Sequence, residues 1–220
     1  MHIPEPFRIQ NRSIIKEIIR SYSFGVLVSH QEGELQATHL PFVLVADPKS
    51  EKEELWFHVA GNNPHPEPGP GLIIFSGPHA YVSPSWYEEK NAVPTWNYVA
   101  IHAKGTIHAV KEPFEMRQLM ARTVEEYEKI RPLPEGQASD ATTGTSAWTI
   151  DWKNNYMERM LAGVRCFRME IESLEGKAKL SQNHSQERQS KVIQRLSEGN
   201  AGEREVARLM KEMGGAGLPR

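Results

Sequence analysis

Two short stretches rich in aromatic residues hold the side chains best suited to binding a ligand. The first runs from Tyr81 to Tyr87 and the second from Val93 to Tyr98. They concentrate large amphipathic rings, hydroxyl groups and rigid prolines around a hydrophilic loop at residues 88–92. Rings with a polar edge beside hydroxyl groups suit a planar polar molecule better than they suit a plain core strand. The two stretches therefore predict the rim of a ligand site.

The same rings have a second interpretation. Trp and Tyr are enriched at subunit interfaces and also fill protein cores. Trp86, Tyr87, Trp96 and Tyr98 fit a ligand site and an interface equally well on composition alone. Both interpretations stay open at this point.

No pattern in the sequence predicts a metal site or a catalytic nucleophile. His102 and His108 lie six residues apart and share a face of a straight strand, but no HxH or HExxH pattern and no convergent carboxylate accompanies them. The single cysteine, Cys166, lies in an alternating stretch and is expected to be a small buried hydrophobic residue. Ser83 and Ser85 lack a nucleophile elbow, so their hydroxyls are expected to bind a ligand rather than to attack one.

The balance of charges argues against attraction to nucleic acid. The 220 residues hold 26 Lys and Arg against 28 Asp and Glu, a formal net charge of −2, so no global field draws the chain to DNA. Near the C-terminus the basic residues are nearly balanced by glutamates, which is more typical of a solvated face than of a DNA-reading one. Any DNA contact is therefore expected to be local or indirect.

Cysteine usage and hydropathy indicate a cytoplasmic protein without a membrane partner. One cysteine excludes an internal disulfide and suits a reducing compartment. The first residues lack the cationic and apolar pattern of a signal peptide, and no later stretch is apolar enough to span a bilayer.

Apolar spacing predicts the elements of the first half of the chain. A helix should follow a cap at Asn11 or Ser13. Since proline cannot donate to a ladder, Pro41 should place its strand at an edge, or bulge or bend it. The last strand of this half is long enough to bend at Gly105. The predicted strands cover residues 24–29, 35–45, 55–60, 72–76, 80–82 and 95–110.

The second half of the chain is mostly helical by the same criteria. Helices are predicted from Pro113 to near Pro132 and at 151–161, with a strand at 164–171. Two short helices follow, one capped by Ser185 and one starting with a capping box of Asn200 and Glu203. We predict a mainly β fold, a small β-barrel with helical additions, in a domain at 1–184 followed by a C-terminal helical extension at 185–220.

Several short motifs stand in a fixed order along nearly the whole chain. They are Ala37–Phe42, Gly77–Tyr81, Ser83–Tyr87, Val93–Tyr98, Leu174–Lys177 and Lys179–Asn183. Together they closely resemble the PaiB-type proteins, a family described as FMN-binding negative transcriptional regulators.

The resemblance implies a fold, a cofactor and a role. The fold would be the FMN-binding split barrel, related in architecture to pyridoxamine phosphate oxidases, with FMN held in grooves at a homodimer interface. The role would be that of a bacterial, cytoplasmic repressor of genes for protease synthesis and sporulation. The residues themselves carry no sign of the regulatory role.

The resemblance also implies which residues contact the cofactor. Hydroxyl groups and Lys179 can bind the phosphate. Gln182 and Asn183 can form hydrogen bonds with the carbonyls and nitrogens of the flavin ring, and a tryptophan can lie over the isoalloxazine. The residues carried over are Thr38, His39, His58, Asn63, Ser83, Ser85, Trp86, Thr95, Trp96, Asn97, Lys179, Ser181, Gln182 and Asn183.

One segment departs from the family pattern. After the histidine, related chains tend to continue with Ala-Arg and then Asn-Pro and an aromatic residue, whereas this chain has Gly61 and Pro66 at the arginine and ring positions. Because charge-assisted contacts are the stronger phosphate contacts, the missing arginine predicts that FMN binding is weaker or absent.

Two other functions are compatible with the same residues. One is an FMN-dependent oxidoreductase acting on a small molecule, in which the cofactor carries the chemistry. The other is a haem-binding split barrel with His39, His58 or His79 as axial ligand. A protein that stays colourless after incubation with FMN would exclude the oxidoreductase. The absence of a haem absorption band after titration with haem would exclude the haem-binding protein.

Overall fold

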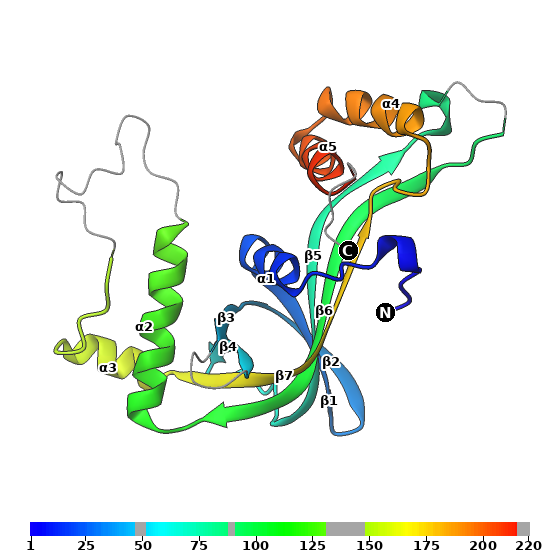
Figure 1. Ribbon diagram of the computed structural model, residues 1–220. Coiled ribbons are helices and arrows are strands. Elements are labelled where there is room, and N and C mark those ends of the chain that lie inside the picture. Colours follow the sequence, from blue (N-terminus) through cyan, green and yellow to red (C-terminus); the bar gives the residue numbers. More distant parts are fainter. Residues whose placement is uncertain (47–51, 88–90, 131–147, 215–220) are drawn as a thin grey trace, which may run out of the picture. The chain divides into compact units, whose positions relative to one another are not determined.

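The protein is seen here in a computed structural model that describes residues 1–46, 52–87, 91–130 and 148–214 (Figure 1). These residues form seven β-strands, five α-helices and two 3-10 helices. The predicted hydrophilic loop at 88–92 lies largely outside the described residues. The prediction of a mainly β fold with added helices is confirmed.

The seven strands form one sheet, in the order β2-β1-β5-β6-β7-β4-β3. Pro41 ends β2, so the strand predicted at 35–45 is divided into β2 and β3, which occupy the two edges of this order. The expectation that Pro41 marks an edge or a bend is confirmed. The strands are β1 (Phe24–Gln31), β2 (Glu34–Pro41), β3 (Val43–Ala46), β4 (Glu53–Ala60), β5 (Gly69–Val82), β6 (Thr95–Val110) and β7 (Val164–Lys179).

Three of the helices begin at caps that the sequence predicts, whereas the helix predicted at 151–161 begins only at Asn155, with Asn154 as its cap. The Asn11 side chain accepts a hydrogen bond from the Ser13 amide at 2.9 Å, and Asn200 and Glu203 form a reciprocal capping box with bonds of 2.7 and 3.0 Å. None of the described helices is long and apolar enough to cross a membrane. The helices are η1 (Glu5–Phe7), α1 (Arg12–Ser21), η2 (Pro84–Trp86), α2 (Pro113–Lys129), α3 (Asn155–Ala162), α4 (Gln186–Ser197) and α5 (Ala201–Gly214).

The chain divides into two compact units, each described by itself. Unit 1 comprises Met1–Gly25, Ile73–Lys104 and Ser173–Arg220, and unit 2 comprises Val26–Leu72 and Gly105–Glu172. Strands β1, β5, β6 and β7 therefore contribute residues to both units.

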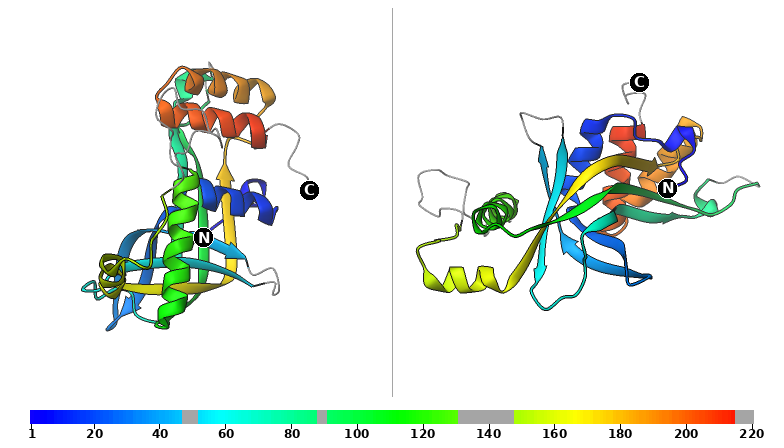
Figure 2. Two further views of the ribbon diagram at one scale, coloured as in Figure 1. Left: turned by 90° about the vertical axis from the view of Figure 1, so that its left-hand side faces the viewer. Right: turned by 90° about the horizontal axis from the view of Figure 1, so that it is seen from below.

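Unit 1 buries apolar faces of helices α1, α4 and α5. The α4 and α5 helices lie side by side in the views of Figures 1 and 2, and Val192, Leu196, Val206 and Met210 are almost fully buried. Apolar residues at helical spacing produce such faces, and their removal from water is the main stabilising contribution.

Unit 2 has apolar groups on both faces of the β4–β7 pair. On one face Phe57 stacks on Phe167, with ring centroids 5.5 Å apart, and Phe42 meets Phe57 edge-on at 5.3 Å. On the other face Cys166 packs with Leu119 of α2. The prediction that Cys166 is a small buried hydrophobic residue is consistent with its 1% exposure.

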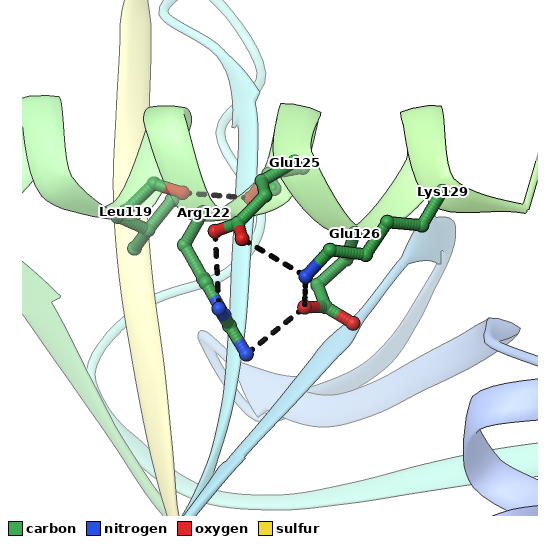
Figure 3. Close-up of polar contacts among 6 residues, drawn as sticks. Leu119, Arg122, Glu125, Glu126 and Lys129 are labelled. Carbon is green, nitrogen blue, oxygen red and sulfur yellow. Dashed lines mark hydrogen bonds and ion pairs between the residues drawn. The ribbon is translucent and has the colours of Figure 1, made fainter. Parts of the chain in front are cut away.

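The exposed side of α2 carries a network of ion pairs, in which two basic residues flank two glutamates (Figure 3). Arg122 pairs with Glu125 and Glu126 at 3.0 and 2.9 Å, and Lys129 pairs with the same two glutamates at 2.9 and 3.2 Å. Such exposed pairs add little stability, so the pattern mainly keeps this side of the helix in water.

Candidate functional site

In unit 1, the two aromatic stretches bring three rings together at the surface. Trp96 on β6 is 53% exposed. Its ring lies 5.8 Å from that of Tyr81, in an edge-on arrangement, and 6.2 Å from that of His79. We call His79, Tyr81 and Trp96 the aromatic patch. Exposed rings of this kind offer flat faces to a planar ligand or to another protein.

Tyr87, at the end of the first stretch, is buried and has a structural role, unlike the exposed rings of the aromatic patch. Its side chain is only 1% exposed, and the Arg188 guanidinium lies over its ring at 3.6 Å from the centroid. Lys191 donates to the Tyr87 carbonyl at 3.3 Å. Tyr87 therefore fastens the end of η2 to helix α4.

Lys179 lies beside the start of β6. Its ammonium donates hydrogen bonds to the Thr95 hydroxyl and, at 2.8 Å, to the Trp96 carbonyl. Partial burial, and secondarily the charge of Lys177, lower the Lys179 pKa from its ordinary value. Lys179, Thr95 and Trp96, three of the predicted residues, thus meet at one place, and Trp96 also belongs to the aromatic patch.

Asn97 and Ser181 form a second group behind them. Asn97 is fully buried and donates to the Ser181 hydroxyl at 3.0 Å, while that hydroxyl bonds the Asn97 carbonyl oxygen at 3.2 Å. Asn97 also donates to the sulfur of Met210 on α5 at 3.4 Å. Ser181 has a positive φ of 65°. The hydrogen bonds of both side chains are made within the chain, so these residues support the site rather than contact a ligand.

Gln182 and Asn183 follow in the same turn. The Gln182 amide donates to the Ala178 carbonyl at 2.6 Å and accepts from the Leu180 amide at 2.7 Å. Its side chain is therefore committed to the turn that ends β7, whereas Asn183 is exposed.

Ser83, Ser85 and Trp86 belong to η2. Ser83 caps this helix, accepting from the Ser85 amide at 3.3 Å, and the two hydroxyls lie 2.8 Å apart. Ser85 is exposed and Trp86 half-buried. The two neighbouring hydroxyls could donate hydrogen bonds to a ligand, and their binding role stays a prediction.

In unit 2, His65 brings two further predicted residues together. Its ring is 4% exposed, with Nε2 at 2.8 Å from the Ser29 hydroxyl and Nδ1 at 2.7 Å from the Thr38 hydroxyl. The His65 amide donates to the Asn63 side chain at 3.1 Å. Thr38 and Asn63 are thus both anchored to a histidine that sequence reasoning missed.

Arg165 fixes the same loop from β7. Its guanidinium donates to the carbonyls of Asn63, Pro64 and Pro66 at 2.7, 3.2 and 3.0 Å, and it lies 5.1 Å from the centroid of the Phe167 ring. Residues two apart in a strand share a face, so the common face of Arg165 and Phe167 follows from the strand predicted at 164–171. Nothing in the sequence indicated that their partner is this loop.

A groove of about 430 Å³ opens beside His65 in unit 2. Its walls come from the β1–β2 hairpin and from the loop before β5. It is lined by Gln31, Glu32, Glu34, Gln36, Pro64 and His65. The carboxylates of its walls disfavour an anionic ligand.

His39 and His58 are not brought to Thr38. His39 follows Thr38 in β2, so the two side chains point to opposite faces. His58 pairs in register with Cys166, which places it on the face where Cys166 packs with Leu119. Burial lowers the His58 pKa, and its Nδ1 atom is buried with no hydrogen-bond partner among the described residues.

The departure at Gly61 has a local structural setting. The Gly61 amide donates to the Gly163 carbonyl at 2.8 Å, and a Cβ at residue 61 would lie 3.0 Å from that oxygen. At the position where the resemblance leads one to expect an arginine, a Cβ atom would therefore lie against the Gly163 backbone, although Gly61 itself is exposed. Pro66 is buried, and its carbonyl is held by Arg165.

No metal centre is found in the part of the chain that the structure describes. There, no three or more His, Cys, Asp or Glu side chains are grouped so that they could hold a metal ion.

Solved structures with this fold include flavin-binding proteins. The FAD and heme binding protein from Mycobacterium smegmatis matches with a TM-score of 0.55 and 14% identity, over 78% of this chain and 73% of that chain. The flavocytochrome Anf3 from Azotobacter vinelandii matches with a TM-score of 0.52 and 10% identity, over 80% of this chain and 72% of that chain. At such identities the likeness shows the fold alone, and the fold is the flavin-binding split barrel, as predicted.

The sequence defines the family. Residues 1–173 match the family model described as "Putative FMN-binding domain". The chain is 32% identical to the protease synthase and sporulation protein PAI 2 from Bacillus subtilis (strain 168), over 96% of this chain and 97% of that protein. The protein therefore belongs to this FMN-binding family, and the predicted resemblance to PaiB-type proteins is confirmed.

Proposed function

We propose that this chain binds FMN. The observation that carries the proposal is the Lys179 ammonium held at the Thr95 hydroxyl beside the aromatic patch. An ammonium and a hydroxyl donate hydrogen bonds that phosphate oxygens accept, and exposed aromatic rings can stack on an isoalloxazine ring. Lys179 supplies a cation that does not depend on the arginine missing at residue 61. The residues present thus fit the cofactor.

Each group has a role in this proposal. Lys179 and Thr95 hold the phosphate, Trp96 covers the ring, and Asn97 with Ser181 keeps the start of β6 in place. Bound FMN supplies hydride and electron transfer.

Removal of the Lys179 charge tests the proposal. Charge-assisted hydrogen bonds contribute about 1.5–3 kcal/mol, so we expect Lys179→Gln to weaken FMN binding by roughly 10- to 100-fold. Riboflavin, which lacks the phosphate, should bind the variant and the wild type alike. Quenching of flavin fluorescence on titration with protein measures both affinities.

Lys211→Gln, at an exposed position of α5 in the same unit, serves as the matched control and should leave both affinities unchanged. A wild-type protein that binds neither flavin would refute the proposal. If Lys179→Gln lost equal affinity for FMN and for riboflavin, Lys179 would not be a phosphate contact.

We further propose that the protein acts as a cytoplasmic homodimer that represses genes for protease synthesis and sporulation. Support comes from the name of the Bacillus relative, which is similar over nearly the full length of both chains. The exposed aromatic patch offers a surface that a second subunit can cover. The net charge of −2 favours local or indirect contact with DNA over broad electrostatic attraction.

Two measurements test this role. Sedimentation equilibrium should give twice the 25.0 kDa mass of the chain. Gel shifts at physiological salt should show tighter binding to promoters of protease and sporulation genes than to random DNA of equal length. Equal binding to both would argue against direct repression, and a monomeric mass would exclude the dimer.

An FMN-dependent oxidoreductase is supported equally by the flavin-binding fold. In that case the FMN-loaded protein should be reduced by a nicotinamide cofactor and reoxidised by a small molecule over many turnovers. Loss of flavin absorbance under anaerobic conditions measures the first step. A loaded protein that resists such reduction would favour the regulatory role.

A further inference from the structure

A groove of about 210 Å³ lies between helices α1 and α5, both of which belong to unit 1. Its apolar lining consists of Ile14 and Ile18 from α1 and of Leu209 and Met213 from α5. Three of these side chains are buried and form the floor, whereas Ile14 is half-buried and gives the groove an apolar wall. None of the residues that line this groove is proposed to contact FMN.

Hydrogen bonds between the two helices hold the groove in shape. The Tyr22 hydroxyl, at the end of α1, donates to the Glu205 carboxylate of α5 at 2.8 Å. Burial, and secondarily the charge of Glu205, raise the pKa of Tyr22 to about 12, so the hydroxyl keeps its proton at neutral pH. Glu205 also accepts from Arg208 at 2.6 and 3.0 Å. The walls of the groove are therefore fixed to each other before any ligand binds.

The charged groups of the groove favour a cation. Arg208 donates to Glu205 and also to both oxygens of Glu212, at 2.6 and 2.7 Å, so two carboxylates balance its single charge. Glu17 of α1 also lines the groove and is exposed. Within the part of the chain that the structure describes, its carboxylate makes no ion pair or hydrogen bond. The groove thus carries an excess of negative charge, which attracts a cation and repels an anion.

We propose that this groove binds a small organic cation with an apolar body, such as an arylalkylammonium ion. The apolar body lies against Ile14 and Met213, and the cationic head lies at Glu17. Pockets for drug-sized ligands have volumes of about 300–1,000 Å³, so the smaller volume of this groove suits a ligand with a single ring. The proposal does not depend on the proposed binding of FMN.

Three probes with a phenyl ring on a two-carbon chain separate the effect of charge from that of the apolar body. Phenethylamine is a cation at neutral pH, 2-phenylethanol is neutral and 3-phenylpropionate is an anion. Each is titrated into the full chain with 13C-labelled isoleucine and methionine methyl groups. We expect phenethylamine to shift the methyl signals of Ile14, Ile18 and Met213 until they saturate. The signals that vanish in Ile14→Val, Ile18→Val and Met213→Leu assign them.

The expected order of affinities follows from the charge of the groove. Since the ion pair with Glu17 is exposed, 2-phenylethanol should bind roughly 2- to 5-fold more weakly than phenethylamine. The anion 3-phenylpropionate should bind more weakly than either.

Glu17→Gln tests the contact with the cationic head. Affinity for phenethylamine should fall roughly 2- to 5-fold, whereas affinity for 2-phenylethanol should not change. Glutamine has nearly the same helix propensity as glutamate, so α1 should be retained, and thermal unfolding checks this. Glu115→Gln, at an exposed position of α2 in unit 2, is the matched control and should leave both affinities unchanged.

Several results would overturn the proposal. Methyl shifts that never saturate, or that occur only away from the groove, would exclude the site. Equal wild-type affinities for phenethylamine and 2-phenylethanol, or an unchanged affinity for phenethylamine in Glu17→Gln, would exclude recognition of the charge. Tighter binding of 3-phenylpropionate would make Arg208 the determinant and exclude a cation. Because these titrations contain no flavin, a failure to bind FMN would refute the proposed function and leave this inference intact.

Discussion

Several of the predicted ligand-binding side chains are bonded to other parts of the chain. Asn97 bonds Ser181, 84 positions away, and Gln182 is committed to its own turn. The sequence identifies amides and hydroxyls one by one but not their partners in the fold, so the contact of these side chains with a ligand stays a prediction. It gave no sign of His65 as an anchor, since a histidine between two prolines in a loop has no periodicity that indicates its surroundings.

At the residue scale, His58 makes a prediction for stability against pH. Burial lowers its pKa below the ordinary 6.5, so the folded state favours the neutral ring. Folding stability should be unaffected above about pH 6.5 and should fall as the pH drops below it, until the folded-state pKa is passed. The slope for one such group is at most about 1.4 kcal/mol per pH unit.

Thermal unfolding of the wild type and His58→Leu between about pH 5 and 8 measures this effect. We expect the variant to lose less stability than the wild type on acidification, with the remainder due in part to His65. His30→Leu, at an exposed position, should keep the wild-type slope. Parallel curves for wild type and His58→Leu would contradict the prediction.

At the scale of elements, local rules predicted boundaries well where the signal is chemical. The missing amide of Pro41 and the capping box of Asn200 and Glu203 were both identified correctly. Strand lengths were less predictable. β7 continues to Lys179 rather than ending near Ile171, and β5 passes through Gly77 and Pro78 without a break. Pairing with neighbouring strands extends both, and that pairing is not visible in one segment alone.

Gly105 is required by the close approach of two strands. A Cβ at this position would collide with the Glu170 carbonyl of β7. Because backbone atoms cannot move aside as a flexible side chain does, we expect Gly105→Ala to lower the free energy of unfolding by about 2 kcal/mol or more. Chemical denaturation measures the change.

Gly202 provides a control of opposite sign. It lies in α5, and a Cβ there would meet only Asn200 at 3.4 Å, an ordinary contact. Gly202→Ala should therefore be neutral or stabilise the protein by up to about 1 kcal/mol. If the two alanine variants had equal stability, the collision at Gly105 would not be the cause.

At the scale of the whole molecule, the order of elements was predictable and their grouping was not. Unit 1 draws residues from three separate parts of the chain, a grouping that depends on tertiary contacts rather than local pattern. The family model ends at residue 173, yet α4 and α5 contact the aromatic stretches through Arg188, Lys191 and Met210. The predicted boundary between residues 184 and 185 remains a prediction.

Truncation at that boundary provides the test. Residues 1–184 alone would expose the partners of four buried apolar side chains of α4 and α5, namely Val192, Leu196, Val206 and Met210. We expect this shortened chain to lack the cooperative thermal transition of the full chain. A sharp transition with retained flavin affinity would show instead that the C-terminal helices are an independent extension.

Ser181 shows how narrow the chemical choice can be at a single position. Its positive φ favours glycine, asparagine or aspartate over most other residues. Its buried bonds to Asn97 require a small hydroxyl, which none of those three supplies. Random substitution at residue 181 therefore has almost no neutral outcome, which makes this serine a useful marker when distant sequences are screened for the same turn.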